Sequence, residues 1–181
     1  MKHWTPLLAL AIPLIALPVL AADMPYAGQQ ARSIKSLSGD DIAAMRKGEG
    51  MGMAKAAELN GYPGPAHVLQ LAAKLGLTEI QQRDVQAIFD RMSAAAKPLG
   101  GELIAQEQAL DQLFAKGEIT PDRLAAATAA IAELQGRLRA VHLSAHLETR
   151  ALLNADQSVR YEQLRGYGDP PALGHHHHHD G

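Results

Sequence analysis

The sequence predicts an all-α protein built around a long, kinked, antiparallel helical hairpin. Aromatic residues make up only 4% of the chain, and β-branched residues are too scattered to form strands. Apolar residues instead recur in alternating steps of three and four along two long stretches, which is the heptad spacing of helices that pack along a shared seam. Two capping patterns, at Thr78 and Asn154, mark where helices begin.

The first 22 residues have the pattern of a secretory signal peptide. Lys2 precedes an apolar run over residues 4–20, and Ala21 and Ala22 then offer a cleavage site. The run is short for a membrane-spanning helix and is broken by prolines. We therefore expect export to the periplasm, cleavage after about Ala21 or Ala22, and no stable membrane insertion afterwards.

The rest of the chain is long enough for one domain with a moderate core. Cysteine is absent, so disulfides cannot stabilise the exported protein. The 17 Lys and Arg residues are outnumbered by 19 Asp and Glu residues, and without a basic stripe nucleic acid is not an expected partner. We expect a disordered lead-in over residues 23–37, a helical domain over 38–168 and a flexible His-rich tail over 169–181.

Short helices are expected ahead of the hairpin. Ser38 can cap a first helix that weakens near Gly48, and the stretch "MAKAAEL" predicts a second helix that ends at the turn "NGYPGP". Pro65 suits the start of a third helix over residues 67–75, and Gly76 suits its end.

Two capping boxes frame the hairpin. In "LTEIQ" Thr78 can cap the first arm while Gln81 reaches back to the cap, and in "LNADQ" Asn154 and Gln157 can do the same for a later helix. The apolar seam of the first arm comprises Val85, Phe89, Met92, Ala96, Leu99, Leu103, Leu110 and Leu113, with polar Gln106 among them. The seam of the second arm comprises Leu124, Ala127, Ile131, Leu134, Leu138, Val141, Ala145, Glu148 and Leu152. The turn "KGEITP" joins the two arms.

The first arm should kink at Pro98, because proline removes a helical donor, and Gly100 and Gly101 follow it. A hairpin this slim buries too little apolar surface by itself. We therefore expect the short helices to fold over it and a second subunit to form a homodimer. Leu143 and Leu147 point away from the seam and add exposed apolar surface for a partner.

The paired motifs "LTEIQ" and "LNADQ" carry a resemblance to a known family. With the signal peptide and the hairpin, residues 38–167 resemble the periplasmic LTxxQ-motif family of the Spy/CpxP type, which includes CnrX-like and ZraP-like heavy-metal sensor proteins. The second motif has Asn154 where the family usually has Thr, and Asn is an equally good cap. The resemblance implies a curved, hooked helical dimer in the periplasm, without enzymatic chemistry.

His142 and His146 lie four positions apart, so both imidazoles can reach one metal ion. Zinc, nickel, cobalt and copper favour such ligands. Ordinary helix-flank histidines have the same spacing, with His142 bordering the seam and His146 facing further outward. A zinc peptidase is excluded because Leu143 stands where the HExxH motif requires Glu.

His67 and Glu58, on the short helices, are the candidates to complete this site. Each also has an ordinary explanation, since His67 can cap or pack at a helix start and Glu58 can be a solvated helix residue. Met51 and Met53 carry soft thioethers that could favour Cu(I), although core packing is the simpler explanation.

Five consecutive histidines near the C-terminus will chelate divalent transition metals whatever their purpose. They are His175, His176, His177, His178 and His179. A purification tag looks similar, but this run has five members rather than six and is followed by Asp180 and Gly181.

Two functions are consistent with these patterns. The leading one is a periplasmic metal-binding protein of the envelope-stress or heavy-metal response, which senses or buffers a divalent transition metal (Zn, Ni, Co or Cu). The alternative is an ATP-independent chaperone that holds unfolded periplasmic proteins. Docking onto a membrane-anchored signalling protein is compatible with either.

Overall fold

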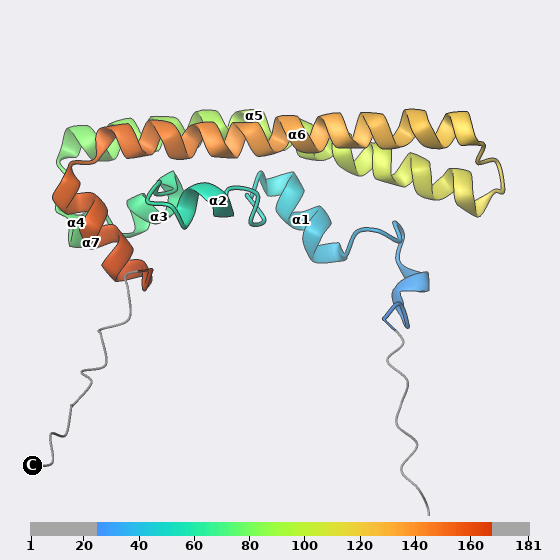
Figure 1. Ribbon diagram of the computed structural model, residues 1–181, viewed down its shortest axis with the longest axis horizontal. Coiled ribbons are helices and arrows are strands. Elements are labelled where there is room, and N and C mark those ends of the chain that lie inside the picture. The colour runs from blue at the N-terminus through green and yellow to red at the C-terminus, as the bar shows by residue number, and fades with distance from the viewer. Residues whose placement is uncertain (1–24, 168–181) are drawn as a thin grey trace, which may run out of the picture.

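The computed structural model describes residues 25–167 and confirms the all-α prediction. The elements are η1 (Gln29–Ala31), α1 (Gly39–Lys47), α2 (Lys55–Glu58), α3 (Pro65–Gln70), α4 (Ala72–Leu75), α5 (Glu79–Ala115), α6 (Pro121–Leu152) and α7 (Ala155–Arg165). Helices α5 and α6 form the long antiparallel pair, and α1, α2 and α3 lie in a row along one side of it (Figure 1). Helices α4 and α7 pack together at the end away from the turn between α5 and α6.

The predicted signal peptide and the predicted His-rich tail lie outside the described residues. Within residues 25–167, no helix is both long and apolar enough to cross a membrane.

Both predicted capping boxes are confirmed, and they meet in space. Thr78 Oγ1 accepts from Gln81 N at 3.1 Å, and Asn154 Oδ1 accepts from Gln157 N at 2.8 Å. The Gln81 side chain also donates to Gln157 Oε1 at 2.9 Å, and the Gln157 side chain donates back to Gln81 Oε1 at 3.1 Å. Gln81 Nε2 further donates to the Leu152 carbonyl oxygen at 2.9 Å. The repeated pentapeptide therefore ties the start of α5 to the junction of α6 and α7.

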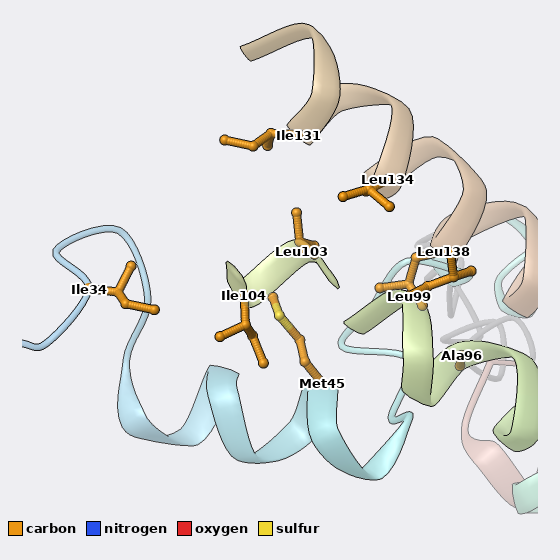
Figure 2. Packing of buried hydrophobic residues seen from close by; sticks show 9 residues of the cluster. All are labelled: Ile34, Met45, Ala96, Leu99, Leu103, Ile104, Ile131, Leu134 and Leu138. Atoms are coloured by element: carbon orange, nitrogen blue, oxygen red, sulfur yellow. The ribbon is translucent and has the colours of Figure 1, made fainter. Parts of the chain in front are cut away.

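A hydrophobic core fixes α1 and the preceding segment on the hairpin. Its buried members are Ile34, Met45, Ala96, Leu99, Leu103, Ile104, Ile131, Leu134 and Leu138. Figure 2 shows Met45 of α1 beside Ile104 of α5, while Ile131 and Leu134 project from α6 toward α5. Met45 is the buried residue of α1, and full burial of such a side chain contributes about 1.5–3 kcal/mol to holding the short helix on the hairpin.

A second buried cluster lies at the other end of the molecule. It comprises Val68, Leu75, Leu77, Val85, Leu153 and Tyr161. These residues come from α3, α4, α5 and α7 and the segments that join them. The two motif leucines, Leu77 and Leu153, both belong to this cluster, so the motifs supply packing as well as capping.

The predicted seam is confirmed for most of its length. Ile131, Leu134 and Leu138 are buried, whereas Leu124 is 39% exposed. Two polar side chains of α6 are buried as well, although the heptad pattern did not include them. Thr149 is 0% exposed, and its hydroxyl is satisfied by donating to the Ala145 carbonyl. His142 is 3% exposed.

Helix α5 continues without interruption through Pro98, and the predicted kink stays a prediction. Gly100 has a different role, because α1 approaches it closely. A β-carbon built on Gly100 would lie 2.5 Å from the Met45 carbonyl oxygen, while one built on Gly101 would meet nothing within 4 Å. Glycine at position 100 is therefore required by the contact between α1 and α5.

Two parts of the N-terminal region differ from the expectation. The helix expected over residues 67–75 is two helices, α3 and α4, because Leu71 leaves helical geometry at φ −100° and ψ 8°. Residues 25–37, expected as a disordered lead-in, include the 3-10 helix and place Ile34 in the core at 3% exposure. Lys35 N donates to Asp111 Oδ1 of α5 at 3.1 Å. Ser36 Oγ donates to Glu107 Oε2 at 2.8 Å. One buried side chain and two long-range hydrogen bonds thus dock a segment that lacks sequence periodicity.

We expect Gly100→Ala to destabilise the protein by about 1–3 kcal/mol, because the added methyl group would press on the α1 backbone. The matched control is Gly101→Ala, which has room for the methyl group and should stabilise α5 by about 0.5–1 kcal/mol. Urea unfolding followed by circular dichroism measures both. Equal effects of the two substitutions would contradict the close contact.

We expect Gln81→Ala or Gln157→Ala to cost about 1–3 kcal/mol, because either change removes a capping side chain and both hydrogen bonds between the two part-buried amides. Gln163→Ala, at an exposed position of α7, should stay within about 0.5 kcal/mol of the parent. A double mutant cycle over Gln81 and Gln157 gives the coupling energy. Strict additivity of the two single substitutions would show that the pair does not act as one unit.

Candidate metal site

A cavity of about 480 Å³ lies between the hairpin and the short helices. Phe89 and Met92 of α5 and His142 and His146 of α6 line one side. The loop over residues 47–54 and helices α2 and α3 line the other side. The four candidate ligands predicted outside the tail, His142, His146, His67 and Glu58, all line this cavity.

His142 lies deeper than the sequence suggested. The side chain is only 3% exposed, and within residues 25–167 its Nε2 atom is buried with no hydrogen-bond partner. Gly50 packs against the ring, since a β-carbon built there would lie 3.4 Å from Nδ1 of His142. Burial, and secondarily the neighbouring His146, lowers the pKa of His142. The imidazole is therefore neutral at pH 7 and has a nitrogen lone pair to offer.

His146 is more exposed than His142, as expected, but most of its side chain is covered. Its side chain is 12% exposed, because the segment around Tyr62 and Gly64 lies over it. Nδ1 of His146 donates to the Tyr62 carbonyl oxygen at 2.7 Å. A carbonyl oxygen can only accept, so Nδ1 carries a proton, and in the neutral ring the lone pair is on Nε2. A hydrogen bond of this kind to a backbone carbonyl is the usual way in which a metal-binding histidine is oriented.

Glu58 is not a solvated helix residue, because its carboxylate is largely covered and accepts hydrogen bonds from several elements. Its Oε1 atom accepts from the hydroxyls of Tyr161 at 2.6 Å and Tyr167 at 3.2 Å, and it lies 3.4 Å from Arg165 Nε. Its Oε2 atom accepts from Gly64 N at 3.1 Å. The carboxylate, 11% exposed, therefore joins α2 to α7 and to the turn before α3.

The environment of Glu58 keeps it ionised. Burial alone raises the pKa of this carboxyl and is the largest single effect. The hydrogen bonds from Tyr161 and Gly64, with the nearby His67 and His146, together outweigh it, so the pKa of Glu58 is lowered. For Tyr161 the same contact acts in the opposite direction, since burial and the hydrogen bond to Glu58 raise the pKa of the phenol.

His67 is the most accessible of the four candidates. Its side chain is 40% exposed, and Nδ1 lies 3.5 Å from Glu58 Oε1. Burial, followed by the charge of Arg165, lowers the pKa of His67, although Glu58 opposes the shift. His67 lies at the start of α3, as expected, with its ring at the cavity wall.

The structure thus brings the predicted residues together without completing a metal site. In the described part of the chain, no group of three or more His, Asp or Glu side chains is placed so that it could hold a metal ion. The unpartnered nitrogen of His142 and the lone pair of His146 fit a transition metal, because imidazole suits such ions. A bound metal would take further ligands from water or from side chains that turn toward it.

Sequence analysis missed three residues that shape this site. Tyr161, Arg165 and Tyr167 surround Glu58 although they follow it by about a hundred positions. No local pattern links residues at that separation. A weak indication was available in α7, where Tyr161 follows Gln157 by four positions and therefore shares its helical face.

Fold and cavity define an all-α hairpin protein with an imidazole-lined cavity. Among known protein families, the family described as heavy-metal resistance matches residues 7–160. The match spans most of the chain, so the protein belongs to the heavy-metal resistance family. Searches of curated proteins and of solved structures gave no match. The narrower resemblance to the LTxxQ-motif family stays a prediction.

We expect the metal-free protein to lose stability as the pH falls below about 6.5, and His142 to carry part of that loss. Its pKa is lowered in the folded protein, so below the unfolded value of about 6.5 the unfolded chain binds a proton that the folded chain does not. The loss continues until the pH reaches the lowered folded value. It amounts to at most about 1.4 kcal/mol per pH unit for one group.

The measurement is urea unfolding with a chelator between about pH 5 and pH 7.5, across the unfolded histidine pKa. The parent is compared with His142→Leu, which should show a shallower dependence on pH. Glu58 does not affect this comparison. Its pKa is lowered in the folded protein, so the stability that its carboxylate contributes is lost only below about pH 4.5. Identical slopes for parent and His142→Leu would contradict a neutral, buried imidazole.

Proposed function

We propose that the protein binds a transition-metal ion in the cavity beneath α6 and serves in the periplasmic response to heavy metals. His142 and His146 are the primary ligands. The observation that carries the proposal is the buried Nε2 atom of His142, which has no partner in the described residues. A buried nitrogen left unpaired costs about 1–3 kcal/mol, and a metal ion would remove that cost.

Family membership and the orientation of His146 support the same conclusion. The heavy-metal resistance family suggests a role in the metal response. The hydrogen bond from His146 to Tyr62 holds its ring as in known metal sites. His67 lines the same cavity and could add a ligand, whereas Glu58, 3.8 Å from His146, already accepts hydrogen bonds at both oxygens. The run from His175 to His179 would add metal-binding capacity.

This site connects metal binding to folding. His142 and His146 belong to α6, whereas Tyr62 and Gly64 belong to the segment that covers them. The donor atoms are therefore held together only in the folded protein. A ligand that binds only the folded state stabilises it by mass action, by about 2.7 kcal/mol at a hundredfold excess over its dissociation constant.

We expect zinc, nickel, cobalt or copper to raise the melting temperature when the tail histidines are absent. The test uses the full chain with His175 to His179 replaced by alanine, because these five residues bind metal whether or not the chain is folded. The comparison protein carries His142→Ala and His146→Ala in addition. Binding should weaken as the pH falls through about 6.5, where imidazole becomes protonated.

Failure of every metal to shift the melting temperature of the tail-substituted protein would refute the proposal. An equal shift in the double variant would place the metal elsewhere.

A second function is favoured by the exposed apolar surface. Leu147 is 58% exposed on α6, next to His146, and Leu59, directly after α2, is 56% exposed. Leu143, expected to be exposed with Leu147, is half-buried. Exposed apolar side chains of this size suit a nonnative client or a second subunit. A chaperone role and a homodimer are therefore our alternative proposals for this face, and docking onto a membrane-anchored signalling protein is compatible with both.

We expect Leu147→Asp to separate these alternatives, because a carboxylate would oppose burial of this surface. If clients bind here, the variant should lose suppression of aggregation of a denatured protein without nucleotide. If a second subunit binds here, sedimentation velocity should show the variant as a monomer and the parent as a dimer. An unchanged variant in both measurements would show that the face has neither role.

A further inference from the structure

We propose that the cavity selects a soft monovalent cation, Cu(I) or Ag(I), and that the thioethers of Met51 and Met92 complete the ligand set that begins with His142. This inference rests on the proposed function, because it assigns the class of metal to the same cavity. Both methionines line the cavity with His142 and His146. Met53 instead packs against the hydrophobic core around Met45.

Neither carboxylate that lines the cavity is both buried and free of hydrogen-bond partners. Glu58 accepts hydrogen bonds at both oxygens, from Tyr161 at Oε1 and from Gly64 at Oε2. Transfer of Glu58 to a metal would leave the Tyr161 hydroxyl, in a side chain only 1% exposed, without its acceptor. Glu49, the other carboxylate that lines the cavity, is exposed and lies 3.7 Å from Lys47. The other donors that line the cavity include the imidazole nitrogens of His142 and His146 and the thioether sulfurs of Met51 and Met92.

Neutral donors in a largely apolar cavity favour a single positive charge. The cost of burying an ion grows with the square of its charge, so a divalent ion costs roughly four times as much as a monovalent ion of equal size. Thioethers are soft ligands and bind Cu(I) in preference to harder ions. Cysteine is absent from the chain, so methionine is its only source of a soft sulfur ligand.

The backbone at Met51 is a second, independent observation. Met51 has φ 46°, and it is the one residue other than glycine with positive φ in residues 25–167. This conformation costs a side-chain-bearing residue about 1–2 kcal/mol. Burial of the side chain in the core does not offset this free energy, because Met51 is 40% exposed. Strained backbone of this kind concentrates at binding sites. Here the strained residue is a methionine at the cavity wall, between Gly50 and Gly52.

The test titrates Ag(I), in chloride-free buffer, into the full chain with His175 to His179 replaced by alanine. Met51→Leu and Met92→Leu are compared with Met53→Leu, because leucine keeps the volume of methionine and removes the sulfur. We expect Ag(I) to raise the melting temperature of the parent. Met51→Leu and Met92→Leu should each weaken Ag(I) binding at least tenfold, since even the loss of a residue that only supports a ligand costs about 10–100-fold. Met53→Leu should bind as the parent does.

Methyl-carbon NMR of the unsubstituted methionines provides a second measurement that does not depend on the variants folding. We expect the methyl signals of Met51 and Met92 to shift on addition of Ag(I), and that of Met53 to stay in place. Unchanged affinity in Met51→Leu and Met92→Leu, or still methyl signals, would overturn the inference. Stabilisation by zinc, nickel or cobalt but not by Ag(I) would overturn it and leave the proposed function standing. No stabilisation by any of these metals would refute both.

Discussion

The cavity depends on the carboxylate of Glu58. Helix α2 has only four residues, too few to be stable by itself, and it forms one wall of the cavity. Glu58 fixes this helix by accepting from Tyr161 of α7 and from Gly64 ahead of α3. An ionised carboxylate is buried only where such donors compensate for lost water. The covering of His142 and His146 by the N-terminal segment is therefore a consequence of one charge-assisted network.

The glutamine pair places the partners of Glu58. Gln81 and Gln157 bind each other through their side-chain amides, which sets the position of α7 relative to the start of α5. Tyr161 follows Gln157 by one helical turn and is buried on the same face. The motif pair and the cavity are thus connected through α7, although neither glutamine lines the cavity.

The protein divides two roles between its polar side chains. Glu58 is saturated with hydrogen bonds and acts as a structural anchor, whereas His142 keeps an unpaired nitrogen in a buried position. An unpaired buried nitrogen and a strained backbone at Met51 both reduce stability. Both destabilising features lie at the same cavity. Proteins commonly tolerate such local destabilisation at functional sites. The role in the metal response suggested by the family agrees with this location.

The sequence by itself determined the elements of the fold, because their signals are local. Heptad spacing, capping boxes and turn residues act within about seven positions of each other, so the long hairpin and the helix starts at Ser38, Thr78 and Asn154 were predictable. The pairing of His142 with His146 was predictable for the same reason. Glu58 and His67 were found as metal-ligand types on the short helices, but their joint position at one cavity could only be guessed.

Tertiary structure alone decided the environments of these residues. Helical periodicity ranked His146 as outward-facing, because it describes one helix and carries no information on what packs across it. The covering segment around Tyr62 leaves little of His146 exposed, although His146 is still more exposed than His142. In the same way Gly100 looked like part of a kink, and only the approach of Met45 showed why glycine is needed there. Burial, hydrogen-bond partners and charge at the site depend on contacts between residues up to a hundred positions apart, which no local pattern records.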